Sequence, residues 1–227
     1  MQLISVNLGQ ERIVPKERGS ERTGIYKLPV EGPVRVTFAG LSGDAICDRK
    51  NHGGPDQAVY VYGGADYAWW SRELRYELSP GTFGDNLTFS GLESARTSIG
   101  DRFTIGTVIL EVTAPRIPCK TLARRMGDPQ FIKRFRRAER PGLYCRVLQE
   151  GSLRLGDAVT WEEYPGTPVL AVELFRDFYT SIYDEATVRR FLAAPLAERA
   201  RRDQEKRLEK LLIEANRAGT TDTSICC

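Results

Sequence analysis

Hydrophobic and polar residues alternate along many short stretches of this chain, and glycine-rich turns separate most of them. Alternation with a period of two is the pattern of half-buried β-strands. Tight turns at Gly100 and Gly156 each lead into such a stretch, as they do in small β-barrels. The pattern predicts a short strand that ends at residue 89 and strands over residues 3–7, 34–38, 58–62, 102–105, 108–112, 143–148 and 153–161.

A helical pattern interrupts the strands at residues 65–78. Tyr67, Trp70, Leu74 and Leu78 recur there at steps of three and four residues, which places them on one face of a helix. Such a face normally packs on the protein interior. We therefore expect its aromatic side chains to belong to the core rather than to stack on a cofactor.

The chain changes character at the linker of residues 164–168, because three helical patterns follow it and no clear strand does. The helices are expected over residues 171–181, 184–193 and 196–217. The whole pattern predicts a mainly β fold with helices, in which a closed β-barrel (PK beta-barrel-like) precedes a small three-helix C-terminal domain. The expected divisions are a barrel domain over residues 1–164, a helical domain over residues 165–218 and a disordered tail over residues 219–227.

Composition agrees with a soluble globular protein. The 227 residues are 41% hydrophobic and 28% charged, which excludes a wholly disordered chain. No apolar run approaches the roughly 18 residues that a membrane helix requires. Residues 1–10 also lack the basic start and long apolar middle of a signal peptide. We expect a cytoplasmic protein without a membrane partner.

Positive charge is concentrated in one segment. The net charge of the chain is +3, but residues 120–140 hold eight basic and two acidic residues, a local charge of +6. A positive field of this kind favours an anionic ligand, although the outer arginines also suit a solvated helix face. The run over residues 133–140 leaves nucleic-acid binding as an alternative. It lacks interleaved aromatic residues, so we expect no stable nucleic-acid partner.

The five cysteines show neither a C-x-x-C pair nor the spacing of a disulfide framework, which argues against a structural zinc site. Cys145 lies in an apolar strand and is expected in the core. Cys47 follows a hydrophobic residue near a turn, and its environment stays open. Cys226 and Cys227 lie in the polar tail. Reduced thiols are the default, so each must be judged by its surroundings.

Cys119 has the most distinctive surroundings of the five. It follows Pro115 and Pro118, which hold the preceding residues extended, and it directly precedes a predicted helix over residues 120–126. Unpaired N–H groups at a helix start favour negative charge, and the basic residues of this helix add to that field. The sequence therefore predicts a thiol that ionises readily.

Two further segments offer hydrogen-bond donors beside glycines: the loop with Arg22 and Thr23, and residues 50–53. Together with Arg116 they suit a phosphate-bearing ligand. A papain-like pair would need the single histidine, His52, to meet Cys119, which the sequence does not decide. The loop carboxylates show no distinguishing spacing for acid–base catalysis. The residues alone thus predict a barrel with a reactive thiol and an anion pocket.

Four motifs in combination resemble the MOSC domain family, which is named for the C-terminal domain of molybdenum cofactor sulfurases. They are KNHGGPD at residues 50–56, FGDNL at 83–87, GD at 100–101 and PRIPC at 115–119. The helices after residue 164 resemble the three-helix module of the YiiM-type branch of this family. The resemblance covers nearly the whole chain.

The resemblance implies a β-barrel that holds the molybdenum cofactor in its molybdopterin form. Cys119 matches the family's cysteine, so it is expected both as the molybdenum ligand and as the catalytic residue. Arg22 stands where the family often has the lysine of a Lys-Thr pair, a change that keeps the charge and alters its geometry. The residues expected around the pterin and its phosphate are Arg22, Thr23, Lys50, Asn51, His52, Gly53 and Arg116.

The YiiM-type branch further implies an oxidoreductase that detoxifies small N-hydroxylated compounds, including hydroxylaminopurine-type bases. Its electrons are expected from a separate flavoprotein reductase, because this chain carries no flavin or nicotinamide fingerprint. An alternative is a carrier module that holds a persulfide on Cys119. The apolar stripe of Leu208, Leu211 and Leu212 either packs on the barrel or pairs with a second copy, so a homodimer is one of two expectations.

Overall fold

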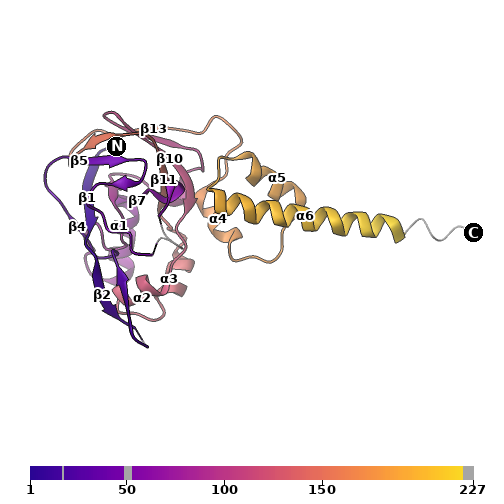
Figure 1. Ribbon diagram of the computed structural model, residues 1–227, viewed down its shortest axis with the longest axis horizontal. Coiled ribbons are helices and arrows are strands. Elements are labelled where there is room, and N and C mark those ends of the chain that lie inside the picture. Colours follow the sequence, from indigo (N-terminus) through magenta and orange to yellow (C-terminus); the bar gives the residue numbers. More distant parts are fainter. Residues whose placement is uncertain (17, 49–52, 222–227) are drawn as a thin grey trace, which may run out of the picture.

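The computed structural model describes residues 1–16, 18–48 and 53–221. Its main sheet has eight strands in the order β13-β9-β10-β11-β7-β8-β1-β4 (Figure 1). Strands β7 and β8 pair in parallel, and the other neighbours are antiparallel, so the sheet is mixed. The bounds are β1 (Leu3–Gly9), β4 (Lys27–Pro29), β7 (Val59–Gly63), β8 (Leu87–Phe89), β9 (Arg102–Ile105), β10 (Val108–Pro115), β11 (Leu143–Gln149) and β13 (Thr160–Glu162).

The expected closed β-barrel is wrong. In the part of the chain that the structure describes, the edge strands β4 and β13 do not pair with each other, so the main sheet stays open. Both edge strands are three residues long, and β4 ends at Pro29, which has no backbone N–H to donate. An isolated bridge between Gln2 and Ala158 and a few backbone hydrogen bonds beside it link the start of β1 to the segment before β13, and they do not join β4 to β13. Alternation along a strand predicts its buried face but not its neighbours.

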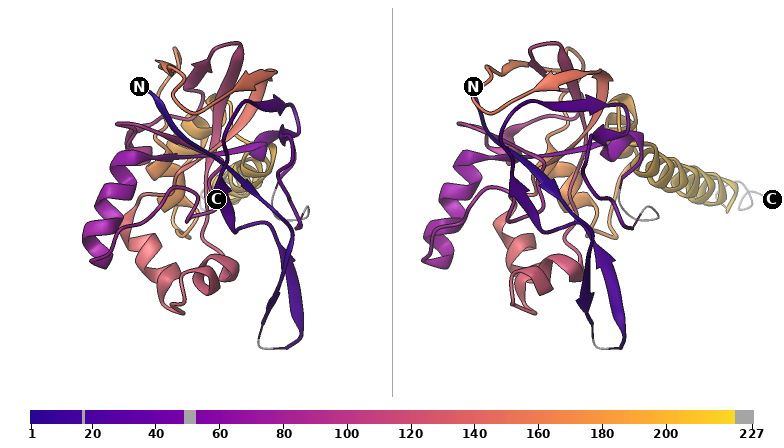
Figure 2. Two further views of the ribbon diagram at one scale, coloured as in Figure 1. Left: turned by 90° about the vertical axis from the view of Figure 1, so that its left-hand side faces the viewer. Right: turned by 60° about the vertical axis from the view of Figure 1, so that its left-hand side comes forward.

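Two small sheets accompany the main one. The first has the order β12-β5-β6, with β5 (Val34–Thr37), β6 (Gly40–Leu41) and β12 (Gly151–Leu153). The second is the hairpin of β2 (Arg12–Pro15) and β3 (Ser20–Thr23), which projects from the body of the molecule (Figure 2). Arg22 and Thr23 were expected in a loop and instead lie in β3. The charged residues of this hairpin leave no hydrophobic alternation that could predict it.

Three helices cover the aromatic part of the core: α1 (Gly64–Leu74), α2 (Lys120–Arg125) and α3 (Phe131–Ala138). Trp70 of α1 is fully buried, as expected, and its ring centroid lies 5.2 Å from that of Phe131 and 5.9 Å from that of Phe135. Helix α1 ends before the expected residue 78, because Arg75 adopts a left-handed conformation (φ 61°) that closes it. Two short 3₁₀ turns, η1 (Pro55–Gln57) and η2 (Ser94–Arg96), also lie in the part of the chain before the C-terminal helices.

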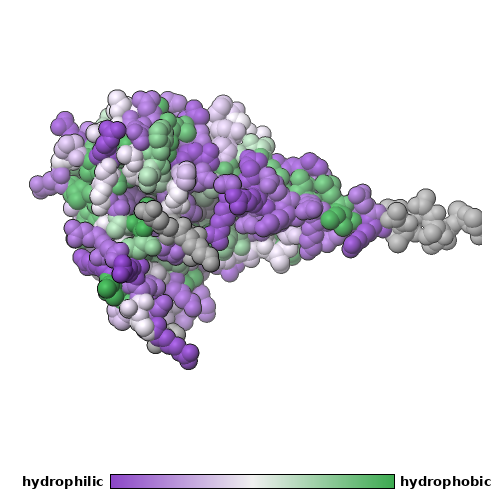
Figure 3. Space-filling model, in the orientation of Figure 1, coloured by the Kyte–Doolittle hydropathy of each residue, from purple (hydrophilic) through white to green (hydrophobic). Residues whose placement is uncertain are grey.

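The three expected C-terminal helices are confirmed as α4 (Ala171–Asp177), α5 (Glu185–Ala193) and α6 (Glu198–Thr221). They pack beside the main sheet, and α6 projects away from it (Figure 1). The projecting part shows hydrophobic surface among hydrophilic side chains (Figure 3). Leu212 and Ile213 of α6 are exposed. The homodimer and the domain division at residue 164 stay predictions. None of the helices in the described ranges combines the length and apolar character of a membrane span.

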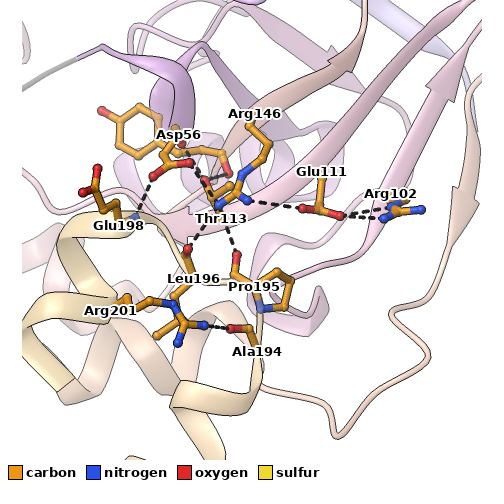
Figure 4. A network of polar contacts seen from close by, with 11 residues as sticks. Asp56, Arg102, Glu111, Thr113, Arg146, Ala194, Pro195, Leu196, Glu198 and Arg201 are labelled. Carbon is orange, nitrogen blue, oxygen red and sulfur yellow. Dashed lines mark hydrogen bonds and ion pairs between the residues drawn. The ribbon is translucent and has the colours of Figure 1, made fainter. Parts of the chain in front are cut away.

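A polar network joins the helices to the sheet (Figure 4). The guanidinium of Arg146 on β11 lies 3.0 Å from the carboxylate of Asp56 and donates to the carbonyl oxygen of Leu196 at 3.1 Å. Asp56 also accepts a hydrogen bond of 2.6 Å from the backbone N–H of Glu198, the first residue of α6. Thr113 of β10 donates to the carbonyl oxygen of Asp56 at 2.6 Å. These contacts fix the start of α6 against the strands that lead to Cys119.

Replacing Trp70 with alanine should lower the free energy of unfolding by about 3–5 kcal/mol, because it leaves a large cavity among well-packed rings. Urea unfolding measures the loss. Trp69→Ala is the matched control. Trp69, the sequence neighbour of Trp70, is half-buried, so its replacement should lower the free energy of unfolding clearly less. Equal losses in the two variants would contradict the assignment of Trp70 to the centre of this cluster.

Candidate functional site

Cys119 lies where the structure changes from sheet to helix. Strand β10 ends at Pro115, four residues run on without regular structure, and α2 begins at Lys120 with Cys119 as its N-cap residue. The predicted short helix after the cysteine is therefore confirmed. Cys119 is half-buried and lines two cavities that meet beside it. The two prolines set this position by keeping the backbone extended until the helix begins.

The smaller cavity has a volume of about 260 Å³ and is enclosed mainly by the sheet side of the molecule. It collects five of the residues predicted from the sequence, although they come from distant parts of the chain. Tyr60 and Tyr144 add aromatic walls to it. The predicted residues brought together here are Arg22, Thr23, Gly53, Arg116 and Cys119.

The hairpin contributes two residues of different character to this cavity. Arg22 stands at its outer edge, where 70% of the side chain is exposed and an ion pair of 3.2 Å joins it to Glu11. Thr23 is buried, and its hydroxyl oxygen accepts a hydrogen bond from the backbone N–H of Ile25 at 3.2 Å. Arg22 can therefore turn toward an anion at the mouth, whereas Thr23 shapes the wall.

The predicted residues Lys50, Asn51 and His52 lie outside the described residues, so their part in the site stays a prediction. Gly53 is described and lines the cavity with φ +82°. A side chain there would need a left-handed backbone, and its Cβ would come within 2.9 Å of Ile46. Glycine therefore lets the backbone of this loop approach closely to whatever the cavity holds.

Arg116 is the most unusual charge in the cavity wall. It is 4% exposed, donates a hydrogen bond to the carbonyl oxygen of Phe83, and lies 4.9 Å from the ring centroid of Tyr60. Burial opposes its charge, but the neighbouring Tyr60, Tyr144 and Cys119 hold the pKa of Arg116 above its usual value. Its Nε atom is buried without a hydrogen-bond partner among the described residues.

No ion pair within the described ranges joins Arg116 to a carboxylate. A buried guanidinium without a counterion is costly, and an anion that enters the cavity would remove that cost. A thiolate at Cys119 would supply one negative charge nearby, and a phosphate-bearing ligand would supply more. The donor set of this cavity thus fits an anionic ligand that also meets a sulfur atom.

The larger cavity has a volume of about 660 Å³ and lies between the sheet side and the C-terminal helices. Residues from α2 form one side, and residues from α4 and α6 form the other, among them Asp177 and Gln204. Cys119 and Tyr144 line both cavities. A ligand in either cavity therefore reaches the same sulfur.

Comparison with known proteins identifies the family. The profile of the MOSC domain matches residues 48–160. YflK of Bacillus subtilis is 36% identical over 154 residues, which cover 68% of this chain and 70% of that protein. YiiM of Escherichia coli is 34% identical over 154 residues, or 66% of this chain and 67% of that protein. The chain belongs to the MOSC family.

Two further relatives extend the MOSC assignment. A protein of Gibberella moniliformis named reductase is 35% identical over 178 residues, but they span 75% of this chain and only 31% of that protein. The crystal structure of YiiM from Geobacillus stearothermophilus superimposes with a TM-score of 0.75 at 27% identity, covering 91% of this chain and 98% of that one. The likeness to YiiM thus includes the C-terminal helices, as the resemblance in the sequence implied.

The sequence did not identify the ion pair of Lys27 and Asp44 in the wall of the MOSC cavity. Both side chains are at least nine-tenths buried, and Asp44 also accepts a hydrogen bond of 2.9 Å from the side-chain amide of Asn86. Burial lowers the pKa of Lys27, and Asp44 opposes that change. The one sequence signal for this ion pair was that Asn86, which contacts Asp44, belongs to the FGDNL motif. Asp44 and Lys27 themselves follow no spacing rule.

The basic run over residues 120–140 is used largely within the molecule. Arg124 pairs with Glu21, and Arg140 pairs with the fully buried carboxylate of Asp66 at 2.6 Å. Each such pair neutralises a positive charge that the local count of +6 treats as available to a ligand. The positive field that this run directs at a ligand is therefore smaller than its charge of +6 indicates.

Replacing Asp44 with asparagine should lower the free energy of unfolding by about 3–5 kcal/mol at neutral pH, because Lys27 is then a buried charge without a counterion. Glu185→Gln is the control. It removes an exposed ion pair with Arg189 of 2.7 Å and should cost at most about 0.5 kcal/mol. Chemical unfolding of the three proteins measures both differences.

The deficit of Asp44→Asn should also shrink as the pH rises. The unfolded chain binds more protons than the folded one between the lowered pKa of Lys27 and its unfolded value of about 10.4, so stability rises with pH in that window. Loss of Asp44 lowers the pKa of Lys27 further and widens the window toward neutral pH. A deficit that stays constant between about pH 7 and pH 10 would contradict the role of Lys27.

Proposed function

We propose that this MOSC protein is a molybdenum cofactor-dependent reductase of N-hydroxylated compounds, such as hydroxylaminopurine-type bases. The observation that carries the proposal is Arg116, a buried guanidinium without a carboxylate partner among the described residues, in a cavity that Cys119 also lines. The relative of Gibberella moniliformis that is named reductase supports the reaction class. The family membership supports the cofactor.

The residues of the smaller cavity fit an anionic pterin cofactor. Arg116 would bind a negatively charged group from inside the cavity, and Arg22 would bind one from its edge. The glycine backbone at Gly53 allows close approach of a flat or phosphate-bearing ligand. Cys119 would supply a soft thiolate to molybdenum, which prefers sulfur ligands. Lys50, Asn51 and His52 are proposed to complete this cradle.

When bound, the cofactor would supply the transfer of two electrons and accept an oxygen atom. Reduction of a hydroxylamino compound breaks the N–O bond: two electrons and two protons convert R–NH–OH to R–NH₂ and water. We propose that a separate flavoprotein provides the electrons. The protein's own groups bind and orient the reactants, and Tyr60 and Tyr144 exclude water from the wall beside Arg116.

Protein purified from cells with intact cofactor synthesis should contain molybdenum and pterin, and should reduce 6-hydroxylaminopurine with a chemical electron donor. Cys119→Ser should lower the rate by at least about 100-fold. Loss of a residue that only hydrogen-bonds to a metal ligand already lowers metal affinity or activity by about 10- to 100-fold. Cys47→Ser is the matched control, because Cys47 is a thiol in the wall of the same cavity. It should keep the wild-type rate.

Three outcomes would contradict the proposal. Protein without molybdenum and without reductase activity under these conditions would overturn it. A labile sulfur on Cys119, detected by mass spectrometry without bound pterin, would favour the persulfide carrier instead. Equal loss of activity in Cys47→Ser and Cys119→Ser would remove the special role of Cys119.

A further inference from the structure

The FGDNL motif at residues 83–87 supplies the contact that orients Arg116. The carbonyl oxygen of Phe83, the first residue of the motif, accepts a hydrogen bond from the guanidinium of Arg116. A carbonyl group carries no net charge, so it orients the guanidinium without neutralising it. The charge of Arg116 therefore stays available to an anion in the smaller cavity.

A tight turn of the backbone carries this carbonyl group. Gly81 and Gly84 adopt left-handed conformations with φ of +83° and +78°, and the N–H of Gly84 donates to the carbonyl oxygen of Gly81 at 3.0 Å. A Cβ atom at residue 84 would come within 2.8 Å of Ile25 and 3.5 Å of the Nη1 atom of Arg116. Glycine at this position thus leaves room for Arg116 beside the turn.

Tyr67 of α1 contacts Phe83 in two ways. Its ring stacks on the ring of Phe83 with the centroids 5.2 Å apart, and its hydroxyl oxygen accepts a hydrogen bond of 3.4 Å from the backbone N–H of Phe83. The same hydroxyl donates to the carboxylate of Asp85 at 2.5 Å. Burial and the carboxylate of Asp85 raise the pKa of Tyr67 well above its usual value, so the hydroxyl keeps the proton that it donates.

Asp85 fixes the other end of these contacts. Its side chain is fully buried, and its carboxylate also accepts hydrogen bonds from the hydroxyl of Thr88 at 2.8 Å and from the backbone N–H of Gly81 at 3.3 Å. The carboxylate therefore holds the turn directly at Gly81 and indirectly, through Tyr67, at Phe83. The contacts run without interruption from Asp85 to the guanidinium of Arg116.

We propose that Tyr67 and Asp85 are positioning residues, which set the direction of Arg116 through the backbone of Phe83 and so raise the affinity of the smaller cavity for an anionic ligand. This inference rests on the proposed function, because it assigns the residues that orient the anion-binding group of that site. Neither Tyr67 nor Asp85 lines either cavity, so neither touches a ligand there directly.

Inorganic phosphate serves as the probe, and isothermal calorimetry measures its affinity for the full chain. Tyr67→Phe keeps the ring and removes the hydroxyl, so it should weaken phosphate binding about three- to tenfold, the range that one buried hydrogen bond spans. Asp85→Asn should act in the same direction, because its NH₂ group would face donors that the carboxylate now accepts from.

Tyr62→Phe is the matched control. Tyr62 belongs to the same aromatic cluster, and its hydroxyl also makes two hydrogen bonds: it accepts one of 2.9 Å from Trp70 and donates one of 2.8 Å to the carbonyl oxygen of Arg140. These hydrogen bonds do not reach residues 81–85. Tyr62→Phe should therefore lower stability much as Tyr67→Phe does and leave the phosphate affinity unchanged. Melting curves confirm that each variant is folded.

A double-mutant cycle separates positioning from a general loss of packing. Arg116→Met alone should weaken phosphate binding about 10- to 100-fold, as the loss of a hydrogen bond from a charged group does. Adding Tyr67→Phe should then change nothing, because no guanidinium is left to orient. The inference is overturned if Tyr67→Phe weakens binding equally in both backgrounds, if Tyr62→Phe weakens it as much as Tyr67→Phe, or if the wild-type protein binds no phosphate.

The molybdenum and pterin content of the same proteins distinguishes this inference from the proposed function. Tyr67→Phe should retain less of both than Tyr62→Phe when the two are purified from the same cells. Phosphate binding with the expected pattern, in wild-type protein that holds no molybdenum, would support the positioning role and overturn the cofactor. Reductase activity in the wild type, together with unchanged phosphate binding in Tyr67→Phe, would overturn the positioning role and leave the proposed function in place.

Discussion

The contact of Arg146 with Asp56 is the constraint on which the arrangement of the site depends. Arg146 extends from the sheet, Asp56 accepts the first backbone N–H of α6, and Arg146 also binds backbone carbonyl oxygens just before that helix. Removing one partner from a partly buried charged contact of this kind is strongly destabilising, because it leaves the other charge without compensation. The contact of Arg146 with Asp56 helps to position the C-terminal helices against the sheet. The larger cavity lies between those helices and the sheet side, so its shape depends on the same contact.

Two cavities of different chemistry meet at Cys119 because of this arrangement. The sheet side supplies Arg116, whose buried charge has no carboxylate partner among the described residues and therefore favours an anion. The helical side supplies Asp177, which accepts hydrogen bonds from Gln204 and Arg207 in the wall of the larger cavity. A chain that lacked its C-terminal helices would keep the first environment and lose the second. The site thus depends on contacts between segments far apart in sequence.

Local features of the fold could be predicted because they depend on neighbours in the chain. The strand over residues 102–105 has the expected bounds, Cys145 is fully buried, and a short helix begins directly after Cys119. Pairing of distant strands was not predictable to the same degree. The barrel did not close because its edge strands are short and separate, and the hairpin that carries Arg22 has no apolar alternation to announce it.

The sequence by itself determined the motifs that mark the family and the extended segment with two prolines that leads into a helix at Cys119. Both follow from backbone preferences of adjacent residues. Only the tertiary structure decided which charges are compensated: Lys27 meets Asp44, whereas Arg116 meets no carboxylate in the described part of the chain. The physical reason is that burial and ion pairing depend on which segments the fold brings together, and no local pattern of residues encodes that choice.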